Sequence, residues 1–339
     1  MAFHLYGNIL TFYGVAANNR GESQGNITTL QKLLWQGETH TVVSSEAIRW
    51  AIRYYWQKAG IPVNRVWNDD LPNEQNPRWQ DPKFNPIEYI DDDLLGFFEA
   101  ESAKKDTKDD NQKPENNQQA DNRDGEQQDI SADLEEISTT KKKRKKEPKP
   151  KGKVTDRRGR LDVTRAISTI PYDGKVTFSS KSGKKDRTSI YGTEFHGTKY
   201  QFGFGITPES CKDKSRVLNL LDAIVSIYRV GGNHGRFLFD FAPESIVLRW
   251  TKDFAPRFLY CYNEDEMGDI SIPKLLRQIR SGDLDPTEFW IGGEMTEHLQ
   301  GSEYEQINQR SGVKAIVEAL KEKIVQDLSI SNDVEENIG

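Results

Sequence analysis

Apolar residues recur at the 3.6-residue period of a helix in three parts of the chain, around residues 44–58, 213–230 and 313–328. We predict helices there and a shorter helix over residues 28–36. The segment 44–58 is also bounded by start and stop signals. Ser44 or Ser45 can cap its first turn, because a serine oxygen accepts the free N–H groups there.

Strands are predicted where apolar and polar residues alternate or where β-branched residues cluster. The predicted strands are 3–13, a segment near 160–170, 200–206, 245–250 and 257–262, with a hairpin between about 173 and 199. Residues 14–26 are polar and contain glycine, which favours a loop. This order of elements predicts an α+β fold, in which a four-stranded antiparallel sheet carries two helices on one side. That is the ferredoxin-like arrangement also used by RNA-recognition (RRM) modules.

Composition divides the chain. Only 35% of the 339 residues are hydrophobic, and the mean hydropathy is -0.78. No aromatic residue occurs between Glu99 and Pro171, so this stretch cannot bury enough apolar surface to offset its ordering entropy. We therefore predict that residues 101–152 are disordered.

Two cysteines without a CxxC spacing, no signal pattern and no long apolar run favour a cytoplasmic protein with no membrane contact. The same absence of Cys and His clusters predicts no metal and no cofactor.

The net charge of -6 hides an uneven distribution of charge along the chain. Residues 141–160 contain twelve basic and two acidic residues, whereas 99–136 contain thirteen acidic and five basic ones. The basic run at 141–153 fits a localisation signal, a mobile polycation that touches nucleic acid, or a solvated charged segment.

The helix at 44–58 carries a second, polar face. Ser45, Arg49 and Arg53 follow one another at four-residue spacing. A helix N-terminus attracts anions, and arginine forks match phosphate geometry. These residues therefore fit a phosphate-binding surface, and the alternative is an ordinary solvated helix face.

Two further segments suggest contacts with an anion. The predicted hairpin has a basic tip with Lys181, Lys184, Lys185 and Arg187. The glycine-rich run "GGNHGRF" at 231–237 would let backbone N–H groups approach phosphate without obstruction by Cβ atoms.

A set of segments in a fixed order resembles one known family. These segments are "GNILTFYGVAANNRGESQGN", "GETHTVVSSEAIRWAIR", "DDDLLGFFEAE", "GRLDVTRAIS", "YGTEFHGTKYQFGFGI", "VGGNHGRFLFDFAPES" and "IVLRWT". Together they resemble the backbone subunit of type I CRISPR Cascade surveillance complexes, in the DevR-type branch of subtype I-B. The long charged insertion departs from compact members of that family.

The resemblance implies a fold and a division of the chain. It implies a modified RRM-like palm formed by residues 1–60 and 160–265, with a β-hairpin thumb at about 173–199. It implies helical fingers within 61–159, which also hold the charged insertion, and a C-terminal helical part at 266–339.

The resemblance also implies a function and a set of partners. Such subunits are non-catalytic, polymerise along the spacer of a guide RNA and present that guide for pairing with target DNA. The implied partners are the CRISPR guide RNA, the target DNA strand, other copies of the chain, and the guide-end caps and small and large subunits of Cascade. The residues expected to contact RNA are Asn18, Asn19, Arg20, Ser44, Ser45, Arg49, Arg53, Lys181, Lys184, Lys185, Arg187, His196, Gly231, Gly232, Asn233, His234 and Arg236.

Two other functions stay open at this stage. An endoribonuclease of the related RNA-binding fold, acting on guide-precursor RNA, could use His40, His196 or His234 as an acid or base. Asp173 or Asp186 in the hairpin could serve metal-dependent cleavage, although a single aspartate without a ligand cluster is weak support. A free-standing DNA-binding regulator would be a small dimer on duplex DNA, but the sequence contains no recognisable helix-turn-helix.

Overall fold

The computed structural model describes residues 1–17, 23–72, 75–76, 78–100, 154–180, 190–227, 229–231, 237–299 and 301–330, with only the backbone of residues 100 and 303. These fall into one unit of residues 1–97 and 157–339 and a second unit, 98–156, of which few residues are described.

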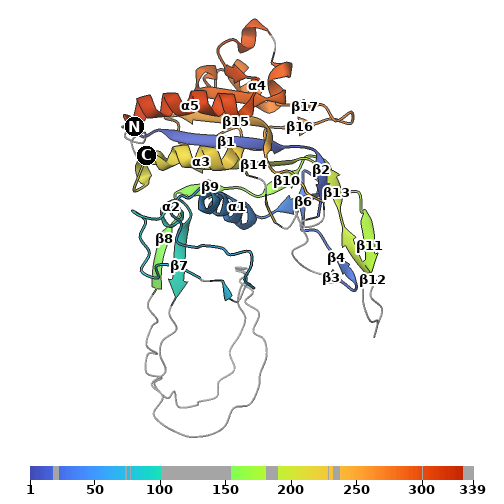
Figure 1. Ribbon diagram of the computed structural model, residues 1–339. Helices are drawn as coiled ribbons and strands as arrows, with labels where there is room; N and C mark the ends of the chain where they lie inside the picture. The colour runs from blue at the N-terminus through green and yellow to red at the C-terminus, as the bar shows by residue number, and fades with distance from the viewer. Residues whose placement is uncertain are drawn as a thin grey trace, which may run out of the picture. The chain divides into compact units, whose positions relative to one another are not determined.

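A nine-stranded sheet lies at the centre of the first unit (Figure 1). Its strands are β1 (His4–Thr11), β5 (Lys32–Trp35), β6 (Glu38–Val43), β9 (Leu161–Val163), β10 (Ala166–Ser168), β14 (Tyr200–Ile206), β15 (Pro243–Thr251), β18 (Phe289–Gly293) and β19 (Asn308–Arg310). The order is β19-β18-β15-β1-β14-β10-β6-β5, and β9 also pairs with β14. Every pair is antiparallel except β18 with β19. The predicted α+β class with a mostly antiparallel sheet is confirmed, although the sheet is larger than the four strands expected.

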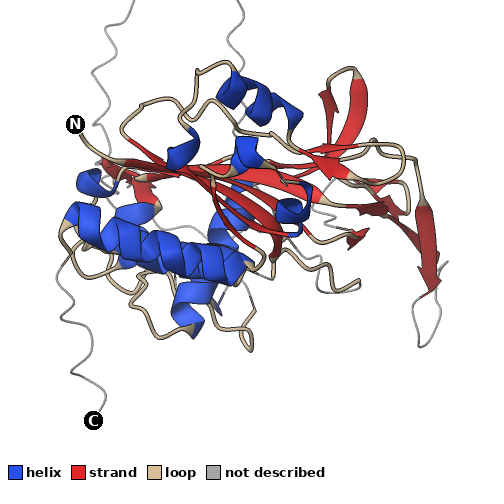
Figure 2. Ribbon diagram, turned by 90° about the horizontal axis from the view of Figure 1, so that it is seen from above, coloured by secondary structure: helices blue, strands red, loops and turns tan. Residues whose placement is uncertain are grey.

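Helices lie on both sides of this sheet (Figure 2). The helices are α1 (Ser45–Lys58), α2 (Ile90–Leu94), α3 (Arg216–Val225), α4 (Pro273–Arg280) and α5 (Val313–Leu328). The apolar faces of α1, α3 and α5 share one core with Leu5, Phe202 and Leu248 of the central strands. On the opposite face, Leu10 and Val247 pack with Leu275 of α4 and with the loops around it.

The α5 helix packs closely on β18 because β18 contains a glycine where the two meet. A Cβ atom on Gly292 would lie only 2.3 Å from Cγ2 of Ile316. The C-terminal part, 266–339, was expected to be helical. It also contains strands, because β18 and β19 join the central sheet and α5 packs over them.

A smaller sheet forms an arm that extends from one end of the central sheet (Figure 1). It consists of β11 (Val176–Ser180), β12 (Ile190–Glu194), β4 (Ile27–Thr28) and β3 (Ser23–Gln24), in that order. At its base, β2 (Gly14–Ala16) pairs with β13 (His196–Thr198). The predicted hairpin is confirmed, and strands β2 and β3 lie in the segment 14–26 that we predicted as loop, with β4 directly after it.

Two secondary-structure predictions are wrong. Residues 28–36 do not form a helix, because β5 and β6 make a hairpin whose two turn residues, Gln36 and Gly37, have φ of 52° and 92°. Such a turn matches the twist of paired strands. Residues 257–262 form no strand, because Arg257 and Tyr260 adopt φ of 61° and 54°, which interrupts an extended backbone.

The stretch between α1 and residue 99 is mostly irregular. Its only α-helix, among the residues described there, is the five-residue α2, so the helical character expected of the fingers is not seen in this part. Prolines at 62, 72, 82 and 86 explain this, since proline lacks the N–H that a helix interior requires. Strands β7 (Gly96–Ala100) and β8 (Val154–Arg158) then pair with each other, and the insertion predicted to be disordered, 101–152, lies outside the described residues.

Two smaller strands, β16 (Asn263–Glu264) and β17 (Ile270–Ser271), form a hairpin.

No helix within the described ranges is long and apolar enough to cross a membrane.

Candidate nucleic-acid interface

The first turn of α1 is capped as predicted, by Ser44. Its hydroxyl oxygen accepts the backbone N–H of Ala47 at 3.2 Å. The Ser45 hydroxyl donates to Oε1 of Glu46 at 3.2 Å. The carboxylate of Glu46 in the first turn offsets part of the positive potential that would attract an external anion.

Arg53 points into the protein. Its Nε donates to Oδ2 of Asp91 at 2.9 Å, and its side chain is 14% exposed. Burial lowers the pKa of Arg53, while Asp91 acts in the opposite direction. The same Asp91 accepts the backbone N–H groups of Asn64 and Arg65. The four-residue spacing placed Arg53 beside Arg49, but the ion pair with Asp91 occupies its Nε.

Asp91 belongs to a turn of three buried carboxylates, Asp91 to Asp93, each at most 1% exposed. Asp93 bridges Nη2 of Arg157 at 2.5 Å and Nη1 of Arg216 at 2.9 Å. Asp92 forms no ion pair with a described arginine and instead accepts from the side chain of Asn64 and the N–H of Asn85. Burial raises the pKa of Asp92 to about 6. This turn therefore joins α1, α3, β8 and the irregular stretch 62–86 through interior charges.

Arg49 lies one turn before Arg53 and is only half-buried. Its Nη2 donates to the backbone oxygen of Leu95. Burial lowers the pKa of Arg49, and the nearby carboxylates of Glu46 and Asp162 raise it in part. Asp162 belongs to β9, so Arg49 stands beside this strand, and no carboxylate among the described residues accepts a hydrogen bond from it.

His196 is buried at the base of the arm, 1% exposed. Its Nδ1 lies 2.8 Å from the hydroxyl of Thr41, and its Nε2 lies 3.1 Å from the backbone oxygen of Pro171. Burial lowers its pKa. With both ring nitrogens engaged inside the protein, His196 is not placed to touch RNA or to transfer a proton to it, and we correct its inclusion among the contact residues.

His40 is similarly buried, at 6% exposure, with Nδ1 2.7 Å from the backbone oxygen of Ser168.

Gly231, the first residue of the glycine-rich run, has φ of 61°, which a glycine adopts readily.

The remaining predicted contact residues lie outside the described residues. They are Asn18, Asn19, Arg20, Lys181, Lys184, Lys185, Arg187, Gly232, Asn233, His234 and Arg236.

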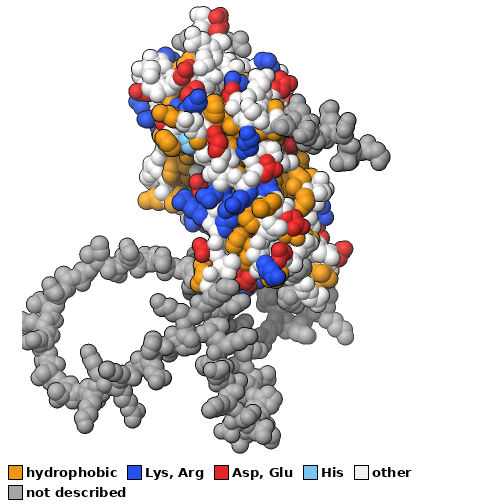
Figure 3. Space-filling model, turned by 90° about the vertical axis from the view of Figure 1, so that its left-hand side faces the viewer, with side chains coloured by type: hydrophobic (Ala, Val, Ile, Leu, Met, Phe, Trp, Pro, Cys, Tyr) orange, Lys and Arg blue, Asp and Glu red, His pale blue; other side chains and the backbone are white. Residues whose placement is uncertain are grey.

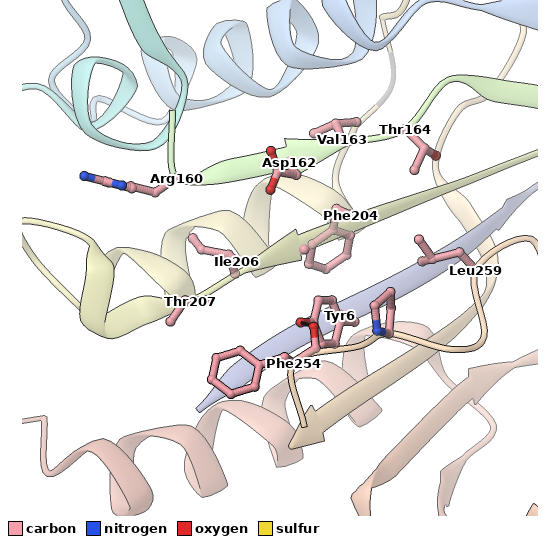
Figure 4. Close-up of a pocket in the computed structure, with 12 residues that line it drawn as sticks. Tyr6, Arg160, Asp162, Val163, Thr164, Phe204, Ile206, Thr207, Phe254 and Leu259 are labelled. Carbon is pink, nitrogen blue, oxygen red and sulfur yellow. Dashed lines mark hydrogen bonds between the residues drawn. The ribbon is translucent and has the colours of Figure 1, made fainter. Parts of the chain in front are cut away.

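A groove of about 350 Å³ crosses the central sheet on the far side of β9 from α1 (Figure 4). Asp162 and Thr164 lie along one wall, and Tyr6, Phe254 and Leu259 along the other, with β14 between them. We did not predict this groove, because its walls come from three segments that lie far apart in the sequence, near residues 6, 162 and 254. The alternation of Phe202, Phe204 and Ile206 with glycines was the only sequence signal that bore on its floor.

Basic side chains gather in the middle of one face of the molecule (Figure 3). Strand β8 and the start of α3 lie on this side in Figure 1; Arg158 of β8 and Lys212, in the loop before α3, are exposed cations. Arg158 is 85% exposed, and its Nη2 is 4.0 Å from Oδ1 of Asp162. A positive surface thus adjoins the end of the groove near Arg160.

The described residues include no group of three or more His, Cys, Asp or Glu side chains placed to hold a metal ion.

Comparison with known proteins gives one strong sequence relative. The chain is 36% identical over 321 residues to the "CRISPR-associated protein Cas7/Cst2/DevR" of Myxococcus xanthus (strain DK1622), covering 90% of this chain and 91% of that protein. No protein-family model matches.

Two solved structures are similar to this chain at low sequence identity. A chain of a "CRISPR RNA-guided surveillance complex, pre-nicking" is 9% identical with a TM-score of 0.53, covering 95% of this chain and 100% of that chain. A chain of a "CRISPR RNA-guided surveillance complex" is 11% identical with a TM-score of 0.49, covering 94% and 99%. The first likeness shows a common fold.

Proposed function

Because the chain belongs to the CRISPR-associated Cas7/Cst2/DevR family, we propose that it is a non-catalytic subunit that binds CRISPR guide RNA. Copies of it polymerise along the guide spacer, form the backbone of a Cascade surveillance complex and present the guide for pairing with a target DNA strand. The match over about nine-tenths of both chains is the observation that carries this proposal. The subtype I-B assignment remains a prediction.

The arm supports self-association. Phe178, Ile190 and Tyr191 are 64%, 54% and 40% exposed on β11 and β12. Apolar side chains grouped on an extended element favour a partner that covers them. We assign the arm, residues 173–199, as the thumb, which contacts the neighbouring copy. Residues 1–60 and 160–265 form the palm in this assignment, and 61–159 form the fingers with the insertion.

The polar surface beside β9 supports sequence-independent binding of RNA. Arg49 and Arg158 flank this strand from α1 and β8. Phosphate contacts carry no sequence information, which suits a subunit that must accept any guide. We retain Arg49, Ser45 and the eleven undescribed positions as proposed RNA contacts, and we assign Arg53 a structural role through Asp91.

The test is to co-express the chain with a repeat–spacer array and sequence the RNA that co-purifies. We expect spacer RNA on particles far heavier than the 38.8 kDa of one chain. The variant Arg49→Glu should lower the RNA yield for all spacers alike, whereas the matched control Arg280→Glu, on the exposed side of α4, should leave it unchanged. A chain that purifies as an RNA-free monomer would contradict the proposal.

A further inference from the structure

Strand β14 forms the floor of the groove between its two walls. Phe202, Phe204 and Ile206 of β14 point into the core, so the outward positions between them are Gly203 and Gly205. A Cβ atom on Gly205 would lie 2.9 Å from Cδ1 of Tyr6, and one on Gly203 would lie 2.7 Å from Cδ2 of Leu259. The side chains of Tyr6 and Leu259 therefore pack directly over the two glycines, at positions where the Cβ atom of any other residue would clash.

One wall of the groove is aromatic. Tyr6 of β1 stands opposite Gly205 in the sheet register, and its hydroxyl donates to the backbone oxygen of Phe254 at 2.5 Å. Burial raises the pKa of Tyr6, so the hydroxyl stays protonated and holds this contact at neutral pH. Phe254 is 76% exposed at the mouth of the groove. A fixed ring with a second, open ring beside it offers a platform for a flat ligand.

The other wall is polar. Asp162 of β9 also pairs with Gly205, so Tyr6 and Asp162 face each other across that glycine. The Asp162 side chain is 78% exposed, and within the described part of the chain it forms an ion pair only with Arg158, at 4.0 Å. Thr164 is fixed by the N–H of Gly203, which donates to its hydroxyl at 2.8 Å. Arg160 lies at one end, and the exposed Arg165 follows Thr164.

We propose that this groove holds one unstacked nucleobase of the bound single-stranded RNA. The base lies against Tyr6 and Phe254, the nucleotide's phosphates lie toward Arg158 and Arg160, and a base that carries an amino group also donates to Asp162. The apolar wall matches the flat face of a base, the carboxylate an amino group on its edge, and the flanking cations its phosphate. Stacking tolerates any base. This proposal rests on the RNA-binding function proposed above. It adds a preference, because cytosine carries an amino donor where uracil carries an oxygen.

The experiment uses the full chain with short oligocytidine and oligouridine of equal length, measured by fluorescence anisotropy. Phe254→Ala should weaken binding of both by about tenfold. Wild type should bind oligocytidine about threefold more tightly, and Asp162→Asn should remove that ratio. Met267→Ala, which truncates a side chain 90% exposed on the β16–β17 turn, is the control and should change nothing. Ultraviolet crosslinking with mass spectrometry should place a nucleotide adduct on Tyr6 or Phe254.

The outcomes separate the two proposals. RNA binding that is unchanged by Phe254→Ala, with adducts only elsewhere, overturns the base site and leaves the RNA-binding function standing. A wild-type chain that binds no RNA overturns both. Protein–protein crosslinks at Phe254 without nucleotide adducts would show that a second copy occupies the groove, and would also overturn the base site.

Discussion

Arginines and aspartates form ion pairs in two regions of the protein, and these pairs are buried in one region and exposed in the other. Around α2, the carboxylates of Asp91 and Asp93 hold Arg53, Arg157 and Arg216 in the interior. At the groove, Arg158 and Asp162 stand 4.0 Å apart and more than three-quarters exposed. The first set leaves few free donors and acceptors, whereas the second can engage a ligand. The contrast shows that a charged residue can be proposed to contact RNA only after its partners inside the protein have been identified.

The largest effect should come from the interior set. Asp93→Ala removes the carboxylate from two buried guanidinium groups and should lower the free energy of unfolding by about 3–5 kcal/mol. Asp162→Ala, at the groove, should change it by less than about 0.5 kcal/mol because that side chain is exposed. Urea denaturation of both variants measures the difference. If the two variants are equally stable, the interior and the groove aspartates do not differ in their contribution to stability.

The comparison can be sharpened within one helix. Arg53→Ala should cost about 2–3 kcal/mol, because Asp91 loses its cation but keeps two backbone N–H donors. Arg49→Ala loses one hydrogen bond to a backbone oxygen and should cost about 1 kcal/mol. RNA affinity should respond in the reverse order when it is measured on folded protein. If Arg53→Ala weakens RNA binding more than Arg49→Ala at equal folded fraction, then Arg53 has a direct role in binding.

Sequence reasoning succeeded where neighbours in sequence decide the outcome. The Ser44 cap, the apolar face of α1 and the β11–β12 hairpin all depend on residues close together in the chain. It failed for Arg53, whose partner lies 38 residues away in an irregular stretch. It missed the groove for the same reason, since Tyr6, Asp162 and Phe254 meet only after β1, β9 and β14 pair. The strand predicted at 257–262 failed because Arg257 and Tyr260 adopt positive φ, which the apolar character of the segment does not reveal.

The interior set should also respond to pH, through Asp92. Its pKa rises from 3.8 to about 6 on folding, so the folded state binds this proton more tightly than the unfolded state. The stabilisation is therefore complete below the unfolded pKa and is lost as the pH rises through 6, by about 2–3 kcal/mol. Asp92→Asn keeps an oxygen that can accept from Asn64 and Asn85, and it should flatten this dependence. Urea midpoints between pH 4.5 and 7.5 test it. If wild type and Asp92→Asn show the same dependence of stability on pH over that interval, the assignment to Asp92 is refuted.

A small effect should also come from deleting residues 104–150, which lie between the paired strands β7 and β8. Closing a long loop costs little more than closing a short one, about 0.6 kcal/mol for each doubling of length. Because β7 and β8 bring the two ends of the segment together, shortening it should change the free energy of unfolding by less than about 1 kcal/mol, and in the stabilising direction. Thermal melts of the full and shortened chains measure this. A large fall in melting temperature would show that the insertion packs on the fold, contrary to its predicted disorder. A preserved melting temperature with weaker RNA retention would instead assign its basic run, 141–153, to the nucleic acid, because mobile cations add salt-sensitive affinity without a folded contact.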